Sequence, residues 1–322
     1  MFLQNGDFEE LERPSRHGLP ERGLALLIAA LFLLSLGAAV YFYLAGDEGG
    51  SAPTPTPAPP AATPITDAAG EVLLLEAYVL DVQGDCFFAR AADGSTLLVD
   101  AGCGADAEAI DAFLQAHSVA RLDAVFVSRP VESRLGGMAA IVERYPVSAC
   151  YLTADCLASP LAKPLLRALD AQGLAPVETM ASFVSVIDWA ENVELRVLSP
   201  HDVTYPSAED RSLMLRLQYG KSAILLAGDA HALAERMAVK VLPNELLHAD
   251  VLLAGDHGSG EASSQRFLSA VQPTIALISA GSAPPGDAAL ERLAACGARI
   301  LRTDETGTLH ILLDGAAATV VE

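Results

Sequence analysis

Apolar and polar positions alternate along residues 72–315 in a way that predicts interleaved strands and helices. Short apolar runs, typical of buried strands, are separated by longer stretches with apolar positions three or four residues apart. The runs predict strands at 72–82, 95–100, 122–127, 147–152, 193–198, 213–217, 223–227, 251–254, 274–278, 299–302 and 308–312, and the longer stretches predict helices at 105–116, 138–144, 161–171, 232–239, 263–271 and 287–296. This order, with hairpins at the start and in the middle, predicts an α/β fold with two mixed sheets between helices.

The N-terminal part has a different pattern. Residues 23–46 carry no charged side chain and are long enough to cross a bilayer as a helix. Arginines precede this span and Asp47 and Glu48 follow it, so the positive-inside bias predicts a cytoplasmic N-terminus. A cleaved signal peptide is the alternative, but the apolar run is long for one and Leu44-Ala45-Gly46 is a poor cleavage site.

We therefore predict a single-pass protein of the cell membrane with four parts. Residues 1–22 form a cytoplasmic tail, 23–46 a transmembrane helix, 47–70 a linker rich in Pro and Thr, and 71–322 an extracytoplasmic domain. The chain holds 41 acidic and 20 basic residues, a net charge of −21, which argues against the basic surface that nucleic acids require. The expected partners are the membrane, through the N-terminal helix, and either a protein or a small anionic ligand.

Five cysteines are compatible with two disulfides in an exported domain. Cys86 and Cys103 flank a predicted hairpin, Cys150 and Cys156 are close in sequence, and Cys296 would be left over. Five thiols buried in the core are an equally good interpretation. No Cys-x-x-Cys pair occurs, which argues against a thiolate zinc site.

Polar residues follow several predicted strands. The strand at 122–127 ends in Ser128-Arg129 and is followed by Gly136-Gly137 before the next helix, an arrangement where α/β folds place their chemistry. Asp100 ends another strand and is expected at the same end of the sheet, whereas Asp229 follows the hairpin of 213–227. Each aspartate has a structural alternative, a turn cap for Asp100 and a helix N-cap for Asp229.

The loop of residues 128–137 resembles the signature loop of the metallo-β-lactamase superfamily in its ComEC-like branch, the branch of the competence proteins involved in DNA uptake. That loop reads approximately T-H-P-H-x-D-H-x-G-G. On this pattern the three histidines fall on Arg129, Val131 and Arg134, and the aspartate falls on Ser133. Arginine keeps its charge and offers no lone pair to a metal, so the resemblance places non-ligating residues at these positions.

Other motifs extend the resemblance over about 72–315. The segment 81–85 is similar to the D-V-G-Q-G-D turn, and Gly228-Asp229 matches a T-G-D whose aspartate bridges two metals in the family. Asp256 and His257 fall on the two histidines of G-H-H-G-S, and 302–311 fits R-T-D-x-x-G-T-I-x-I. The resemblance implies an αββα metallo-β-lactamase-like sandwich.

The predicted function is that of a non-catalytic binding or scaffolding protein without a metal cofactor. Its cleft is expected to contain Asp100, Arg129, Ser133, Arg134, Asp229, Asp256 and His257. Because unpaired carboxylates are costly to bury, we predict that the two arginines pair with Asp229 and Asp256 where two metals would sit in the family.

Three alternatives stay open. In the first, the protein is a metal-dependent hydrolase, a nuclease or phosphodiesterase linked to DNA uptake. Its zinc or other divalent ion, for example Mg²⁺, Mn²⁺ or Ca²⁺, would be held by Asp100, Asp229, Asp256 and His257, with His201 or His231 nearby. In the second, Arg129 and Arg134 clamp a small anion. In the third, both arginines lie on a solvated loop.

Overall fold

The computed structural model describes residues 63–182, 186–281 and 284–321. The predicted cytoplasmic tail, the predicted transmembrane helix at 23–46 and the first part of the predicted linker lie outside the described residues. Within the described ranges, none of the helices combines the length and the apolar character that a membrane crossing requires. A small two-stranded turn, in which Thr66 pairs with Val72, precedes the first long strand.

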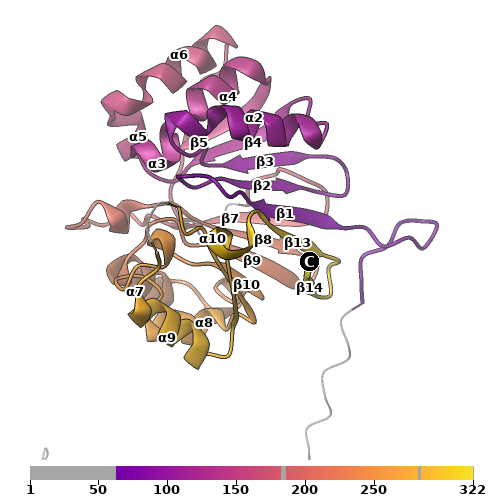
Figure 1. Ribbon diagram of the computed structural model, residues 1–322, viewed down its shortest axis with the longest axis vertical. Coiled ribbons are helices and arrows are strands. Elements are labelled where there is room, and N and C mark those ends of the chain that lie inside the picture. The colour runs from indigo at the N-terminus through magenta and orange to yellow at the C-terminus, as the bar shows by residue number, and fades with distance from the viewer. Residues whose placement is uncertain (1–62, 183–185, 282–283, 322) are drawn as a thin grey trace, which may run out of the picture. The chain divides into compact units, whose positions relative to one another are not determined.

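The first sheet has eight strands and contains the first and the last strand of the described chain. Its strands are β1 (Leu75–Val79), β2 (Phe87–Arg90), β3 (Thr96–Val99), β4 (Leu122–Val127), β5 (Val147–Leu152), β6 (Val177–Glu178), β13 (Leu309–Leu313) and β14 (Ala318–Val321), in the order β14-β13-β1-β2-β3-β4-β5-β6. Pairing is antiparallel from β14 to β3 and parallel from β3 to β6. The C-terminal hairpin therefore completes a sheet begun by the first strands (Figure 1).

The second sheet has six strands and a similar plan. Its strands are β7 (Val193–Ser199), β8 (Met214–Tyr219), β9 (Ser222–Leu226), β10 (Val251–Leu253), β11 (Ile275–Ile278) and β12 (Arg299–Arg302), in the order β12-β11-β10-β9-β8-β7. The hairpin strands β7, β8 and β9 are antiparallel, and β9 to β12 are parallel.

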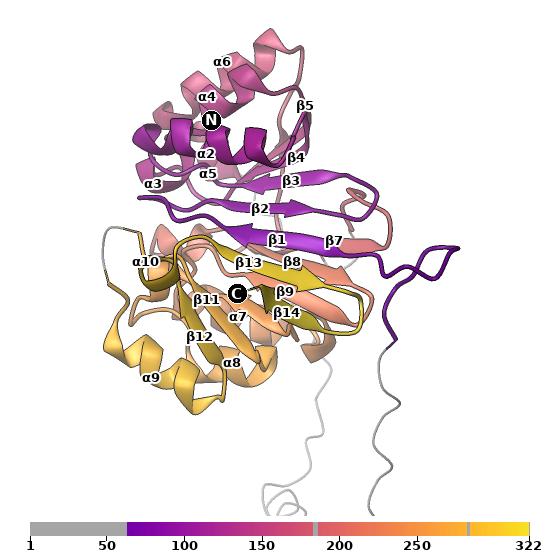
Figure 2. The ribbon, with the colours of Figure 1, turned by 45° about the vertical axis from the view of Figure 1, so that its right-hand side comes forward.

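Helices cover the outer face of each sheet (Figures 1 and 2). The first sheet is covered by α2 (Ala107–Ala116), α4 (Met138–Arg144) and α6 (Lys163–Ala171), and the second by α7 (Ala232–Val241), α8 (Gln265–Val271) and α9 (Asp287–Ala295). Short helices fill the connections: α3 (Glu132–Leu135), α5 (Ala154–Ala158) and α10 (Thr303–Thr306), together with the 3₁₀ turns η1 (Gly104–Asp106), η2 (Pro160–Ala162), η3 (Glu209–Arg211), η4 (Asn244–Leu246) and η5 (Asp256–Gly258).

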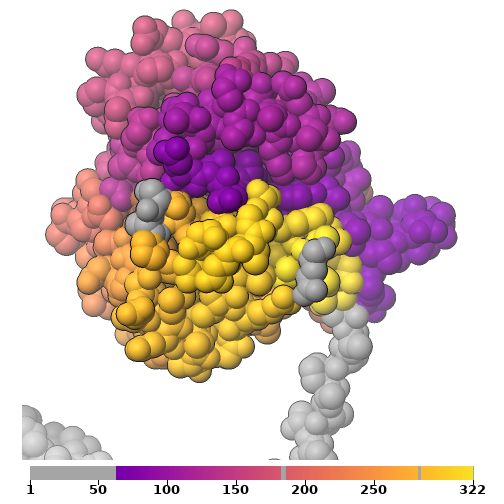
Figure 3. All heavy atoms as spheres, in the orientation of Figure 1, coloured from indigo at the N-terminus to yellow at the C-terminus, as the bar shows by residue number. Residues whose placement is uncertain are grey.

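Successive side chains of a strand point to opposite faces of its sheet. The apolar side chains therefore form three layers, one between the sheets and one between each sheet and its helices. Leu97 and Val99 of β3 join Leu215 and Leu217 of β8 in a core between the sheets, whereas Leu98 faces the helices of its own side. A third cluster lies between the second sheet and α7, α8 and α9. The predicted mixed α/β sandwich is confirmed, and Figure 3 shows the indigo-to-magenta part and the orange-to-yellow part in direct contact on the face shown.

Most predicted elements are present with shifts of one or two residues. Strand β1 is shorter than predicted because the chain turns after Val79, where the Leu80 N–H donates to the Cys86 carbonyl. The hydrophobic pattern does not predict β14, whose alanine and glycine surroundings give little strand signal, nor the single-turn helix α3.

All five cysteines are free thiols. Neither Cys86–Cys103 nor Cys150–Cys156 forms a disulfide, and Cys86, Cys150 and Cys156 are buried, as the alternative of core thiols predicted. Cys103 and Cys296 are only half-buried, so that alternative holds for three of the five. Burial raises the pKa of Cys150 to about 12 and that of Cys156 to about 11, which keeps both thiols protonated and unreactive.

An arginine–carboxylate cluster as the candidate functional site

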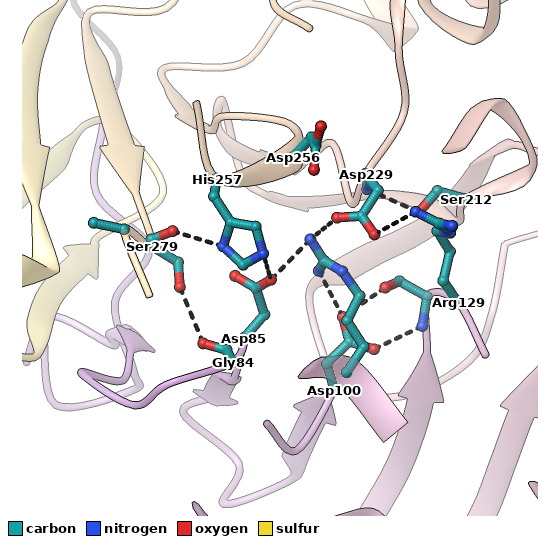
Figure 4. Close-up of polar contacts among 12 residues, drawn as sticks. Gly84, Asp85, Asp100, Arg129, Ser212, Asp229, Asp256, His257 and Ser279 are labelled. Atoms are coloured by element: carbon teal, nitrogen blue, oxygen red, sulfur yellow. Dashed lines mark hydrogen bonds and ion pairs between the residues drawn. The ribbon is translucent and has the colours of Figure 1, made fainter. Parts of the chain in front are cut away.

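The candidate site lies where parallel strands of both sheets end. Asp100 follows β3, Arg129 follows β4, Asp229 follows β9, and Asp256 and His257 follow β10. The two sheets present these ends to each other, so side chains far apart in sequence meet in one place (Figure 4). The predicted convergence of these strand ends is therefore found in the structure.

The backbone that holds Arg134 is fixed from two directions. The Ser133 carbonyl accepts the N–H of Asp85 at 2.8 Å, and the Arg134 carbonyl accepts the N–H of Ala101 at 2.9 Å. A Cβ on Gly84 would lie 2.1 Å from the Ser133 oxygen, so only glycine allows this approach. Ser133 thus contributes its backbone carbonyl to the site, and not the side chain that the sequence analysis had placed in the cleft.

Arg134 lies at the centre of the cluster with only 5% of its side chain exposed. Its Nη1 donates to Asp100 Oδ2 at 2.9 Å, and its Nη2 lies 2.8 Å from Asp85 Oδ2 and also contacts Asp229 Oδ1. Burial acts to lower the pKa of Arg134, but the carboxylates of Asp229, Asp85 and Asp100 hold it well above the ordinary value. The guanidinium is therefore charged and surrounded by three carboxylates.

Arg129 extends the cluster toward the surface. Its Nη1 donates to Asp229 Oδ2 at 2.8 Å, and its Nη2 donates to Glu209 Oε1 at 3.1 Å. Asp229 therefore bridges both arginines, and its own N–H donates to Ser212 Oγ at 2.9 Å. Burial acts to raise the pKa of Asp229, but Arg134 and then Arg129 outweigh it and leave the pKa below its ordinary value. The predicted pairing of both arginines with Asp229 is found.

Asp100 has a left-handed backbone, with φ of 61°, that turns its carboxylate back toward the end of β4. The carboxylate accepts the Ser128 N–H at 2.7 Å and the Ser128 hydroxyl at 2.6 Å, in addition to Arg134. Burial raises the pKa of Asp100 to about 6, although Arg134 and Ser128 oppose the shift. Of the two serines of this loop, Ser128 is the one whose side chain belongs to the site.

His257 connects the cluster to the second sheet. Its Nδ1 lies 2.9 Å from the Ser279 carbonyl and its Nε2 lies 3.2 Å from Asp85 Oδ2. Sequence reasoning did not select Asp85 as a site residue. The Gly84-Asp85 pair that ends the D-V-G-Q-G-D-like turn was the available signal, since that turn leads into the same end of the sheet as Asp100.

Asp256 does not pair with either arginine, which corrects the predicted cluster. Its Oδ2 instead lies 2.8 Å from His231 Nε2, and Figure 4 shows no contact from its side chain to the other residues drawn. The cause is local: η5 has φ of 47° at Asp256 and 53° at His257, so the two side chains diverge. His201 lies apart from the cluster and lines a different pocket with Thr179 and Tyr205.

The donor set for a divalent ion differs from the predicted one. Among the described residues, Asp85, Asp229 and His257 are the group whose ligand atoms all lie within 4.8 Å of one another, whereas the prediction had named Asp100 and Asp256 with Asp229 and His257. Arg134 Nη2 contacts both aspartates of that group. A guanidinium in contact with two of the three donors would oppose a divalent ion placed between them by charge repulsion.

Comparison with known proteins places the chain beside competence proteins. No family model matches the sequence. The chain is 29% identical to ComE operon protein 3 of Bacillus subtilis (strain 168) over 202 residues, 62% of this chain and 25% of that protein. It is 34% identical to competence protein ComA of Neisseria gonorrhoeae over 124 residues, 37% of this chain and 18% of that protein. The resemblance to the ComEC-like branch of the metallo-β-lactamase superfamily is confirmed.

The ComEC-like domain corresponds to only part of each relative. A third match, 36% identical over 95 residues, is to recombination protein 2 of Haemophilus influenzae and covers 29% of this chain and 12% of that protein. The chain thus spans a quarter or less of these relatives.

Solved structures are more distant from the ComEC-like domain. The CmlA β-hydroxylase E377D mutant is 16% identical with a TM-score of 0.49, covering 75% of this chain and 54% of that one. The Rm3 metallo-β-lactamase is 15% identical with a TM-score of 0.39, covering 55% of this chain and 74% of that one.

Proposed function

We propose that this ComEC-like domain is a non-catalytic binding or scaffolding protein in which the guanidinium of Arg134 takes the position of a metal ion. The observation that carries the proposal is the contact of Arg134 Nη2 with both Asp85 and Asp229, the carboxylates that with His257 make up the metal-capable group of the described residues. The N-terminal span of residues 23–46 would tether the domain outside the cell membrane.

The chemistry of the cluster supports this proposal. Metal-dependent hydrolysis needs an ion that holds a water molecule and lowers its pKa. In the cluster, both carboxylates of the metal-capable group already contact an arginine: Asp229 accepts hydrogen bonds from Arg129 and Arg134, and Asp85 Oδ2 forms an ion pair with Arg134. Asp229 accepts one hydrogen bond from each arginine, so its buried charge is balanced without any ion.

Two other functions have less support. A metal-dependent nuclease or phosphodiesterase of DNA uptake agrees with the names of the relatives, but the donor set is blocked by Arg134 and the net charge of −21 opposes binding of a phosphate backbone. An anion clamp would need free donors on both arginines. The Nη atoms of Arg129 and Arg134 are instead directed at carboxylates of their own chain, and Arg134 Nε, which has no partner among the described residues, is buried.

The test is metal binding by the full-length protein and its Arg134→Ala variant. Elemental analysis of the wild type, expressed with added Zn²⁺ and Mn²⁺, should find below about 0.1 ion per chain, and added metal should not change its melting temperature. The variant should lose about 3–5 kcal/mol of unfolding free energy because Asp85, Asp100 and Asp229 lose their shared partner. Added divalent metal should restore part of that loss, since the three donors then face an empty space.

Arg144→Ala is the matched control, because Arg144 pairs with Glu108 and Asp111 on the surface. That variant should melt close to the wild type with and without metal. About one tightly bound ion in the wild type, together with phosphodiester cleavage that EDTA abolishes, would contradict the proposal and favour the hydrolase.

A further inference from the structure

A second arginine site lies on the opposite side of the second sheet from the inner core. Along β8, Leu215 and Leu217 point into the core between the sheets, so Arg216 and Gln218 point to the outer, helix-covered face. Across the hairpin, Arg196 and Glu194 of β7 stand opposite Arg216 and Gln218. These four polar side chains line a pocket of about 640 Å³. Its remaining wall comes from η4, from His248 and from the C-terminal end of α8.

Arg216 is buried, with 4% of its surface exposed, yet no acidic side chain in the described ranges pairs with it. Its Nε donates to the His248 carbonyl at 2.9 Å and its Nη1 donates to Gln218 Oε1 at 2.6 Å. Both acceptors are neutral, and no carboxylate of the described residues forms an ion pair with this guanidinium. The two bonds fix its plane and leave Nη2 without a hydrogen-bond partner in the described part of the chain.

The nearest carboxylates are engaged elsewhere. Glu194 Oε1 pairs with Arg196 Nε, and Asp250 Oδ2 accepts the N–H of Ala223 at 2.9 Å. Burial, aided by repulsion from Arg196, lowers the pKa of Arg216, and the attraction of Glu194 and Asp250 does not offset this. Arg134 is equally buried but has three carboxylates and a raised pKa. A buried cation without a counter-ion is costly, so its presence beside an open pocket indicates an external partner.

We propose that this pocket binds one anionic group of the phosphate or carboxylate class, with the guanidinium of Arg216 as its principal ligand. Arg196, Arg216 and Lys221 supply three positive charges and Glu194 and Glu245 two negative ones, which leaves 3 − 2 = +1. A net charge of +1 suits a single anionic group and disfavours a polyanion such as nucleic acid. Lys221, one of these three cations, is exposed. The site is independent of the Arg134 cluster and of the function proposed for it.

The experiment is a titration of the full-length protein with inorganic phosphate and, separately, with acetate, followed by melting temperature and by calorimetry. Sodium chloride of equal ionic strength is the reference. At least one anion should raise the melting temperature in a saturable way that chloride does not reproduce. The arm that responds identifies the chemical class as phosphate or carboxylate. Arg216→Gln should abolish the response, while Arg121→Gln, at an exposed arginine paired with Asp123, should keep it.

Lys221→Gln keeps the proposal testable if Arg216→Gln does not fold. Because Lys221 is exposed, the variant should fold normally and bind the responsive anion about two- to fivefold more weakly. The proposal is overturned if neither anion gives a saturable response. It is also overturned if a folded Arg216→Gln protein, or in its absence Lys221→Gln, responds as the wild type does.

Discussion

Arg134 and Arg216 show how the same buried side chain has different consequences in different surroundings. Arg134 is enclosed by Asp85, Asp100 and Asp229 and forms a closed internal cluster. Arg216 is held by two neutral oxygens and faces a pocket. Both guanidinium groups are buried, but only Arg134 has carboxylate counter-ions. The cluster around Arg134 stabilises the fold, whereas the guanidinium of Arg216 still attracts an external anion.

The titration of Asp100 gives a prediction at this scale. Its folded pKa of about 6 lies above its ordinary value of 3.8, so the folded state binds the proton more tightly and stability falls as pH rises through this interval. About two pH units at 1.36 kcal/mol each correspond to about 3 kcal/mol. Relative to Asp100→Asn, which does not titrate, the wild type should lose about that much unfolding free energy between pH about 4 and about 7.

Urea unfolding of both proteins at the two pH values measures the difference directly. If the difference in unfolding free energy between the wild type and Asp100→Asn is the same at both pH values, Asp100 is ionised at both. Arg134 and Ser128 would then outweigh the burial of the carboxylate.

At the scale of elements, the turn after β1 and the short helix α3 act as one support for Arg134. The Asp85 N–H of the turn donates to the Ser133 carbonyl, and the Ala101 N–H, just after β3, donates to the Arg134 carbonyl. Neither segment has a strong pattern of its own, and α3 is only one turn long. Their conformation therefore depends on each other, which explains why the hydrophobic pattern did not predict α3.

Gly84→Ala tests this support. The new Cβ would lie 2.1 Å from the Ser133 oxygen and 2.7 Å from the Gly102 Cα, so α3 or the turn must move. We expect a loss of about 1–3 kcal/mol in unfolding free energy, typical of overpacking. Gly260→Ala is the control, because its Cβ would have no neighbour nearer than 3.9 Å and Gly260 has no left-handed φ. Equal stability of the two variants in chemical denaturation would show that the turn and α3 are not mutually dependent.

At the scale of the whole molecule, the charge is strongly unbalanced. The net charge of −21 should make the folded chain repel itself at low ionic strength. Raising NaCl from about 10 to about 150 mM shortens the Debye length from about 30 to about 8 Å, so the melting temperature should rise by about 1–3 °C. Arg134→Ala should show the same increase, because the buried cluster is screened little by salt.

A matched addition of sucrose, which changes no screening, separates this response from general stabilisation. A melting temperature that falls as salt rises would indicate that surface ion pairs such as Arg302–Asp304 outweigh the repulsion.

The sequence by itself determined the elements and the place where they converge. Period-two and helical patterns specify which faces must be buried, and parallel strands bring their carboxyl ends to one edge, so Asp100 and Arg129 could be expected together. Asp229 belongs to the other sheet, and only the family resemblance predicted it in the same cleft. The competence-protein resemblance followed from motifs at those strand ends. Strand and helix patterns depend on residues close together in the sequence, so these elements can be predicted without a structure.

Only the tertiary structure decided which partner each side chain takes. Asp85 belongs to the cluster because the turn after β1 packs on α3. Asp256 lies outside it because a left-handed backbone directs its side chain toward His231. Arg216 became a candidate ligand because the outer face of β8 is left open beside η4. These contacts depend on distances of a few ångströms between segments far apart in sequence, which a local sequence pattern does not encode.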